Sequence, residues 1–185
     1  MESIRERKQL QVEDIIIRLA EEKDFSDIVA LDREIFPGSP INPTTALQCI
    51  FMQRSYVAVT PTGNVVIGYI LANMGEIKEA KVVEISAFGV AEKLQNQGIG
   101  SCLLERVIND SFSWSDDAVM LHTNVENKSI SLYHSVGFRV VKLVEDYYEG
   151  EHLWLNGASK DAYIMMKPFI PFEYLQLKLE GAKTK

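Results

Sequence analysis

Two glycines at the start of an amphipathic helix have a spacing that suggests chemistry. An apolar run, residues 83–90, is followed by a polar segment and then by Ile99, Leu103 and Val107 at helical spacing. Because the first N–H groups of a helix lack intrahelical partners, a glycine-containing helix start can bind phosphate closely. Residues 95–100, Gln-Asn-Gln-Gly-Ile-Gly, match neither the P-loop nor the dinucleotide fingerprint. They predict a diphosphate-binding turn, or else a turn that only packs the helix on the strand.

Glu84 and His122 are the candidate proton acceptors. Glu84 lies in the apolar run of residues 82–90, and His122 lies near the end of a second run, residues 118–123. Histidine changes charge nearest neutral pH, and a positioned carboxylate can act as a general base. Each residue also has a structural interpretation as a hydrogen-bonded strand residue. If they do chemistry, each could take a proton from a group that must lose one before it reacts.

The elements that must position these residues alternate between strand and helix patterns. We expect strands at residues 14–19, 54–60, 65–74, 82–90, 118–123, 140–148 and 161–166. We expect helices over residues 20–35, from Asn42 or Pro43 onward, from about Gln97 to Asn109, and over residues 127–137. Residues 36–40, Phe-Pro-Gly-Ser-Pro, must end the first helix before the second begins.

Ideal alternation along the central strand assigns each side chain to a face of the sheet. One face would carry Val82, Glu84, Ser86 and Phe88, and the other Val83, Ile85 and Ala87. The carboxylate would then share a face with the last aromatic residue of the strand.

The chain resembles the GNAT superfamily of N-acetyltransferases, whose acetyl-CoA motif is Gln/Arg-x-x-Gly-x-Gly/Ala at a helix start. Gln95, Gly98 and Gly100 match this motif, and the resemblance runs from about Ile15 to Pro168. It implies an α+β fold with three α/β/α layers, in which helices flank a mixed sheet of about seven strands with a splayed parallel pair. It also implies acetyl-CoA as co-substrate, no metal, and cofactor contacts from Phe88, Gly89, Val90, Gln95, Asn96, Gln97, Gly98, Ile99, Gly100, Ser101 and Asn127.

The resemblance assigns catalytic roles as well. Many relatives use a glutamate on the central strand as general base, which implies that role for Glu84. The Leu-His pair that ends at His122 resembles the pair of eukaryotic N-terminal acetyltransferases, in which the histidine shares the base work. Tyr133 lies four residues before Gly137-Phe138 and matches the family's general acid for the CoA thiolate. The alternative is a tyrosine that only packs in the core or stacks. A backbone N–H near Val90 would stabilise the oxyanion.

Two further segments resemble acetyltransferases of the ribosomal-protein and eukaryotic catalytic-subunit type, which act on protein N termini. Phe36-Pro37 resembles a segment that walls the peptide groove, and Tyr147-Tyr148 resembles tyrosines that contact the leading residues of the substrate. The alternatives are a simple helix–helix connector and cross-strand packing. The loop of residues 149–160 is expected to cover the groove with Trp154 and Leu155.

Composition is consistent with one intracellular domain. The chain has 185 residues, 46% hydrophobic and 24% charged, so we expect a domain at residues 13–169 between a flexible segment, 1–12, and an amphipathic extension, 170–185. Neither a signal peptide nor a membrane span is recognisable, which favours the cytoplasm, with the nucleus also open. The net charge of −7 argues against nucleic acid as a partner and would attract a cationic amine. Cys49 and Cys102 are expected to be reduced and buried.

Several alternatives remain open at this point. Within the same chemistry, Cys102 in the first helical turn could carry the acyl group covalently, because a helix start lowers a thiol pKa. The acceptor could be a polyamine-type small amine instead of the N terminus of a protein or peptide. The chain could also be a CoA-binding regulatory domain without turnover, since a fold does not determine a function. The resemblance to N-terminal acetyltransferases also leaves open an auxiliary subunit as a partner of this chain.

Overall fold

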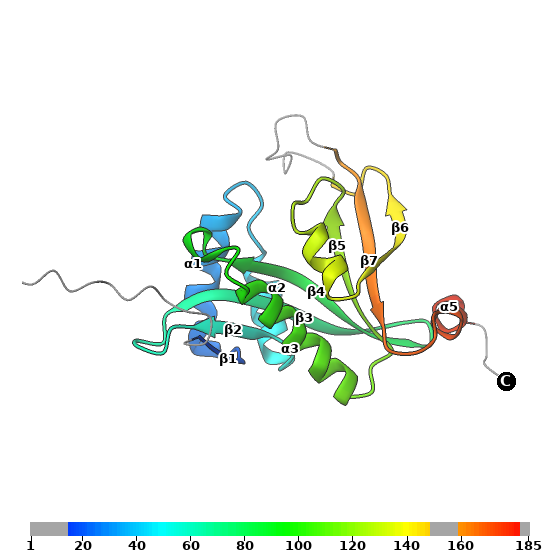
Figure 1. The fold of residues 1–185 in the computed structure, drawn as a ribbon, viewed down its shortest axis with the longest axis horizontal. Coiled ribbons are helices and arrows are strands. Elements are labelled where there is room, and N and C mark those ends of the chain that lie inside the picture. The colour runs from blue at the N-terminus through cyan, green and yellow to red at the C-terminus, as the bar shows by residue number, and fades with distance from the viewer. Residues whose placement is uncertain (1–14, 149–158, 182–185) are drawn as a thin grey trace, which may run out of the picture.

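A seven-stranded mixed sheet forms the middle layer of the molecule (Figure 1). The computed structural model describes residues 15–148 and 159–181. The strands lie in the order β1-β2-β3-β4-β5-β7-β6. Their bounds are β1 Ile16–Leu19, β2 Tyr56–Val59, β3 Val66–Ile77, β4 Ala80–Val90, β5 Ala118–Asn124, β6 Arg139–Val144 and β7 Ala162–Pro168. The helices are α1 Phe25–Ile35, α2 Pro43–Phe51, α3 Ile99–Ser113, α4 Ile130–Ser135 and α5 Phe172–Glu180.

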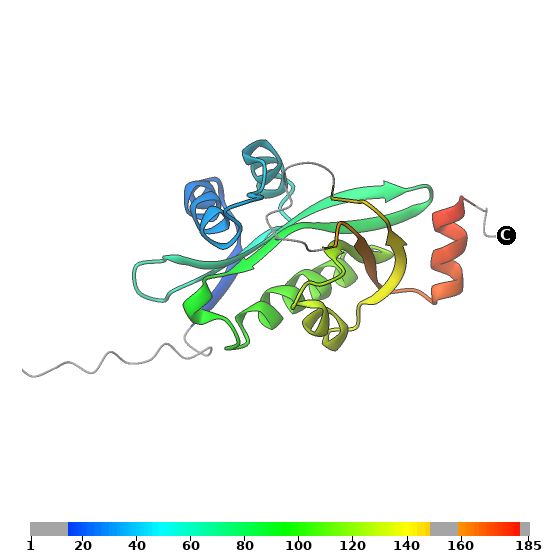
Figure 2. The same cartoon turned by 90° about the horizontal axis from the view of Figure 1, so that it is seen from above.

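Helices cover both faces of this sheet, which confirms the three-layer α+β fold (Figure 2). On one face α1 and α2 pack over β2 and β3, where Val57 and Leu71 are fully buried. On the other face α3 and α4 bury Leu103 and Tyr133 against the strands. Towards the far end of β4, β5 and β7, α5 packs through Leu175. The middle of the first face therefore lies between α1 and α2 on one side and α5 on the other.

The two N-terminal helices form where the sequence predicts them. In α1 the buried side chains Ile28, Val29 and Leu31 share one face, which gives the amphipathic pattern of a surface helix. At the start of α2 the Asn42 side chain accepts a hydrogen bond from the Thr44 N–H at 2.8 Å, and proline occupies the first turn. These are favourable N-terminal signals, because the cap satisfies a free donor and proline has none to lose. The segment between α1 and α2 is thereby held at both ends.

The β3–β4 hairpin is longer than expected and contains a bulge. β3 continues to Ile77 instead of ending at Met74, and β4 starts at Ala80. The register shifts where Leu71 pairs with Ala87 and Ala72 pairs with Ile85, so Ser86 is the extra residue. A bulge reverses the alternation of faces beyond it.

The bulge overturns the faces expected from ideal alternation. Phe88 packs with the core on the α3 side, which also contains Val83 and Ile85, and not on the face of Glu84. Ala87 instead packs on the face that α1 and α2 cover. Because one extra residue separates Glu84 from Phe88, the strand presents a carboxylate to one face and an aromatic ring to the other.

The parallel pair β4–β5 separates halfway along its length, as the resemblance implied. Pairing runs from Val82 opposite Ala118 to Ile85 opposite Leu121, and both strands continue without pairing to each other. Because the Ala91 N–H donates to the Ile67 carbonyl at 2.9 Å, Val90 is a non-hydrogen-bonded partner in the antiparallel ladder with β3. The N–H and C=O groups of Val90 therefore point into the gap.

The C-terminal half differs from expectation at one strand. β6 ends at Val144, not at Tyr148, so Tyr147 and Tyr148 lie in the turn that follows it. The turn contains Asp146 with φ of 52°, a left-handed conformation that interrupts an extended strand. The expected extension is the helix α5, which Lys178 fixes by an ion pair with Asp117 at 2.6 Å. The expected flexible segment, residues 1–12, lies outside the described residues.

Candidate active site

Two adjoining cavities open at the place where β4 and β5 separate. One, of about 320 Å³, is lined by the ends of both strands and by the segment between α1 and α2, and we call it the acceptor cavity. The other, of about 450 Å³, is lined by the start of α3 and the loop before it, and we call it the cofactor cavity. Phe36 and Phe88 line both cavities. The two spaces therefore form neighbouring halves of one cleft.

The start of α3 presents free backbone donors to the cofactor cavity. No side chain caps this helix, and its first intrahelical bond is the Cys102 N–H to the Gly98 carbonyl at 3.1 Å. The preceding N–H groups therefore lack intrahelical partners, and the helix dipole makes this end favourable for a phosphate. Gly98 has φ of 86°, which favours glycine. A Cβ at Gly100 would lie 3.0 Å from the Phe88 ring, so glycine is needed for close packing.

Most residues of the predicted cofactor site line this cavity. They are Phe88, Gly89, Val90, Gln95, Asn96, Gly98, Gly100 and Ser101. Ile99 is instead buried in the core, Gln97 hydrogen-bonds to the Lys93 carbonyl, and Asn127 lines the acceptor cavity. Ile35, Leu94, Ser129 and Leu132 also line the cofactor cavity, and the motif gave no signal for them.

Gln95 has a structural contact within the motif. Its side-chain amide donates a hydrogen bond to the Val90 carbonyl at 3.0 Å, across the gap where β5 no longer pairs with β4. This bond satisfies one of the two backbone groups of Val90 that point into the gap. The Val90 N–H is the other group there.

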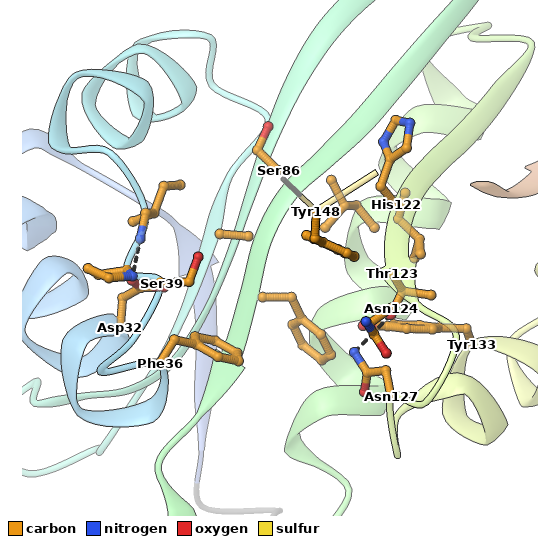
Figure 3. Close-up of a pocket in the computed structure, with 16 residues that line it drawn as sticks. Asp32, Phe36, Ser39, Ser86, His122, Thr123, Asn124, Asn127, Tyr133 and Tyr148 are labelled. Carbon is orange, nitrogen blue, oxygen red and sulfur yellow. Dashed lines mark hydrogen bonds between the residues drawn. The ribbon is translucent and has the colours of Figure 1, made fainter. Parts of the chain in front are cut away.

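Glu84 and His122 meet on the sheet face opposite α3. The His122 Nδ1 lies 3.2 Å from Glu84 Oε1, and the side chains are 20% and 43% exposed, respectively. Glu84 is opposite Met120 in the parallel register, so His122 is two residues further along β5. His122 lines the acceptor cavity and Glu84 does not (Figure 3). The expectation that both contribute is consistent with this geometry, in which the carboxylate contacts the imidazole and the imidazole contacts the cavity.

Both tyrosines of the turn after β6 lie at this site. The Tyr147 ring stacks on the His122 imidazole with 5.0 Å between centroids and 8° between planes. Tyr148 meets Tyr147 edge-on and lines the acceptor cavity. Burial is the main cause that raises the pKa of Tyr147 and raises that of Tyr148 to about 12. Both rings are neutral phenols near pH 7.

Tyr133, on α4, lines the acceptor cavity beside Asn124 and Asn127, and it is 7% exposed (Figure 3). Its ring packs against Phe88 and Phe138, with centroids 6.4 and 6.2 Å away. Burial raises the pKa of Tyr133 to about 12, with a smaller effect from Tyr148. The ring is thus both a core residue and a protonated group that faces the cavity.

The segment after α1 walls the opposite side of the acceptor cavity. Phe36 lines it as predicted, whereas Pro37 is exposed and lines neither cavity. Ser39, Pro40 and Ile41 line the cavity beside Phe36. The role in substrate binding that the resemblance implied for Pro37 stays a prediction.

Asp32 holds this wall in place and was not predicted. The buried carboxylate accepts a hydrogen bond from the Ile41 N–H at 2.6 Å and another from the Tyr69 hydroxyl on β3. Burial and the nearby carboxylate raise the pKa of Tyr69. An aspartate near the end of an amphipathic helix gives no signal of this role in the sequence, because its partners are distant along the chain.

Asn124 and Asn127 shape the inner end of the acceptor cavity. Asn127 donates to the Thr123 hydroxyl and accepts from the Ser129 N–H, both at 2.8 Å. Asn124 accepts from the Glu126 N–H at 2.8 Å and donates to the Ser159 carbonyl at 2.6 Å. These bonds fix the segment between β5 and α4, so the side chains at the end of β5 have defined positions.

The remaining predictions concern residues outside the cleft. Cys49 and Cys102 are both free; Cys49 is buried, but Cys102 is only partly buried and lines neither cavity. The exposed His134 lies away from the cleft, whereas Trp154 and Leu155 lie outside the described residues. Within residues 15–148 and 159–181, no cluster of three or more potential ligands could hold a metal ion. No helix in the described part of the chain could span a membrane.

Comparison with known proteins identifies the family. An N-alpha-acetyltransferase of Sulfolobus acidocaldarius is 29% identical over 165 residues, which cover 82% of this chain and 91% of the relative. The NatC complex bound to Gag peptide and CoA contains a chain with a TM-score of 0.74 and 24% identity, over 85% of this chain and 99% of that one. The structure of Arabidopsis thaliana NAA60 in complex with acetyl-CoA has a TM-score of 0.72 and 24% identity, over 84% of this chain and 98% of that one. The model of the acetyltransferase (GNAT) family matches residues 25–138, and the chain belongs to this family.

Proposed function

We propose that this protein transfers the acetyl group of acetyl-CoA to the N-terminal α-amine of a protein or peptide. The observation that carries the proposal is the Glu84–His122 contact of 3.2 Å on the wall of a cavity that adjoins the glycine-containing start of α3. The names of three relatives support it. One is an N-alpha-acetyltransferase, one was solved with a peptide and CoA, and one with acetyl-CoA.

The residues of the cofactor cavity fit the diphosphate and pantetheine parts of acetyl-CoA. The uncapped N–H groups of Ile99, Gly100 and Ser101 would hold the phosphates at the helix start. The absence of a side chain at Gly100 leaves the helix start close to Phe88, which lines both cavities. When bound there, acetyl-CoA supplies an activated acyl group at the junction of the two halves.

His122 is the proton acceptor in this proposal, and Glu84 assists it. In this proposal the neutral imidazole carries its proton on Nδ1, which lies 3.2 Å from Glu84 Oε1, and Nε2 keeps a lone pair. Nε2 takes a proton from the ammonium form of the substrate, directly or through one water molecule. The Glu84 carboxylate lies 3.2 Å from Nδ1, beside the positive charge that the imidazole gains in this step.

Two further groups of the chain act on the reacting acyl group. The Val90 N–H points into the gap between β4 and β5, where it can donate a hydrogen bond to an oxygen that gains negative charge. Tyr133 faces the adjoining acceptor cavity as a neutral phenol, and its raised pKa of about 12 keeps the proton available for the departing sulfur. Transfer is direct, since Cys102 lines neither cavity.

A small amine is the second candidate acceptor, because the net charge of −7 would attract a polyamine as well as a peptide amine. The discriminating assay offers acetyl-CoA with peptides that carry free or blocked α-amines, alongside polyamines, and locates the acetyl group by mass spectrometry. We expect acetylation of free α-amines. Acetylation confined to polyamines or to lysine side chains of blocked peptides would contradict the proposal.

A variant separates this chemistry from CoA binding alone. Replacing both Glu84→Gln and His122→Ala removes the base but leaves the cofactor cavity intact. We expect the double variant to bind CoA with unchanged affinity in calorimetry and to lose transfer. Undiminished transfer would mean that another group is the base, and absent binding by the unaltered protein would support a different function.

A further inference from the structure

We propose that Tyr147 is a positioning residue for His122: its ring holds the imidazole in the orientation that contacts Glu84. This inference rests on the proposed function, in which His122 is the base. Tyr147 was expected to contact the substrate through its hydroxyl. The contact that the structure shows is with His122. The Tyr147 and His122 rings are nearly parallel, with 8° between their planes and 5.0 Å between their centroids.

The imidazole needs a second contact to fix its orientation, because Glu84 contacts it at a single atom. The one contact, Nδ1 to Oε1 at 3.2 Å, limits the position of one ring nitrogen but allows the ring plane to tilt. The terminal torsion of a histidine side chain is broad, so packing must select its value. A parallel aromatic ring selects the plane, since tilting would separate the stacked faces. Nε2 then keeps a fixed direction.

The position of Tyr147 is itself fixed by hydrogen bonds of the neighbouring backbone. The Asp146 N–H donates to the Asp161 carboxylate, and the Tyr148 N–H donates to the Lys160 carbonyl, both at 3.0 Å. Tyr147 lies between these two bonds and also meets the Tyr148 ring edge-on with centroids 5.0 Å apart. Although Tyr147 is 42% exposed, its ring therefore lies on a turn anchored to the start of β7.

The stacking role and the substrate role predict different variants to be harmful. Tyr147→Phe keeps the stacked ring and loses the hydroxyl, whereas Tyr147→Leu keeps an apolar side chain and loses the ring. For a stacking role, Tyr147→Phe keeps kcat within about twofold, while Tyr147→Leu lowers kcat about tenfold, which corresponds to about 1.4 kcal/mol. Peptide KM should change less than kcat in the leucine variant.

The state of the imidazole provides a readout that does not depend on activity. The chain has three histidines, so nitrogen-15 NMR of the full-length protein can resolve each ring and assign His122 by the variant His122→Gln. The proposal places the proton of the neutral ring on Nδ1, 3.2 Å from Glu84 Oε1, which is the Nδ1–H tautomer. We expect this tautomer in the unaltered protein and in Tyr147→Phe, and a mixture of tautomers in Tyr147→Leu.

The outcomes separate this inference from the proposed function. Equal losses in the phenylalanine and leucine variants with unchanged His122 signals would overturn stacking and support a substrate hydrogen bond. Unchanged kcat and unchanged signals in Tyr147→Leu would also overturn it. The NMR spectra need no substrate. A failure of peptide acetylation would therefore refute the proposed function, while the tautomer result would still test the positioning role of Tyr147.

A second pair of variants tests the anchor without altering the site. Asp161→Ala removes the acceptor of the Asp146 N–H, whereas Asp161→Asn retains an oxygen that can accept it. We expect the alanine variant to show the mixed His122 tautomers of Tyr147→Leu in weaker form and the asparagine variant to resemble the unaltered protein. Indistinguishable spectra for both would show that the anchor does not position the ring.

Discussion

The two halves of the cleft are built in different ways. The cofactor cavity depends on backbone groups and on glycines that lie mainly within residues 88–101, one continuous stretch of chain. The acceptor cavity depends on side chains from five separate segments, from Asp32 in α1 to Tyr148 after β6. A backbone site tolerates changes of neighbouring side chains, whereas a side-chain site changes with each substitution. The first half is suited to a constant ligand and the second to a selected acceptor.

This difference predicts that variants in one half affect one substrate. Removal of the proton acceptor should have the largest effect. His122→Ala should lower kcat about 100-fold or more, because general base catalysis contributes about 10² to 10⁴. Affinity for CoA should not change, since His122 lines only the acceptor cavity. Steady-state kinetics with calorimetry measures both quantities, and a kcat above half of the original would break the comparison.

The next effect concerns Tyr133, which lines the acceptor cavity and packs on Phe88, a residue of both cavities. Tyr133→Phe should lower kcat about tenfold, less than loss of the base, because a thiolate can leave without being protonated, whereas an ammonium cannot attack until it has lost its proton. Its KM values for both substrates should stay within about twofold, since the ring that packs on Phe88 is kept. Equal rates for the variant and the unaltered protein would mean that Tyr133 is only a core residue.

The raised pKa of Tyr133 also predicts how stability depends on pH. The folded state holds the phenol proton until about pH 12, whereas an unfolded chain releases it near the ordinary value of about 10. The contribution of this group is therefore complete below pH 10 and is lost as pH rises towards 12. Thermal unfolding between pH 9 and 12 should show a steeper loss for the unaltered protein than for Tyr133→Phe. Parallel curves would contradict the assigned shift.

A smaller effect should be confined to the cofactor half. In Gly100→Ala the new Cβ would lie 3.0 Å from the Phe88 ring, so the start of α3 or the ring must move by a few tenths of an ångström. We expect the KM for acetyl-CoA to rise about fivefold, or about 1 kcal/mol of binding free energy, with the peptide KM unchanged. Gly75→Ala is the matched control, because a Cβ there meets no atom within 4 Å.

The smallest predicted effect belongs to the wall of the acceptor half. Asp32→Ala removes both acceptor oxygens, so the Ile41 N–H and the Tyr69 hydroxyl lose their partner. We expect a loss of about 1 to 3 kcal/mol in unfolding free energy and a two- to threefold rise in peptide KM. Denaturant titration and kinetics measure the two, and a selective rise in acetyl-CoA KM would contradict the division of the cleft.

The same contrast explains what the sequence could predict. The motif from Gln95 to Gly100 was recognisable because its chemistry depends on glycine spacing at a helix start. Periodicity located the strands and helices, and the resemblance to the GNAT superfamily implied how they are arranged. The faces of Glu84 and Phe88 were mispredicted because a bulge at Ser86 depends on pairing with β3, which periodicity does not describe. Glu84 and His122 were expected to cooperate, but their single contact is a product of the register of β4 and β5.

The acceptor wall was the least predictable part. The resemblance implied contacts from Phe36 and Pro37, whereas the turn after α1 brings Ser39, Pro40 and Ile41 to the cavity beside Phe36. That turn is fixed by Asp32, nine residues before Ile41, and by Tyr69 on another strand. Side-chain contacts between distant segments leave no local pattern in the sequence. The stacked Tyr147 is a similar case, because an expected strand ends early and becomes a turn.

The affinity of a conjugate that occupies both halves tests the central claim most directly. CoA would be joined through an acetyl group either to the α-amine of a peptide or to the side-chain amine of a lysine in the same peptide with a blocked N terminus. Calorimetry should show that the α-linked conjugate binds at least about tenfold more tightly than CoA alone and than the lysine-linked conjugate. Equal affinity for all three, or tighter binding of the lysine-linked form, would contradict the account.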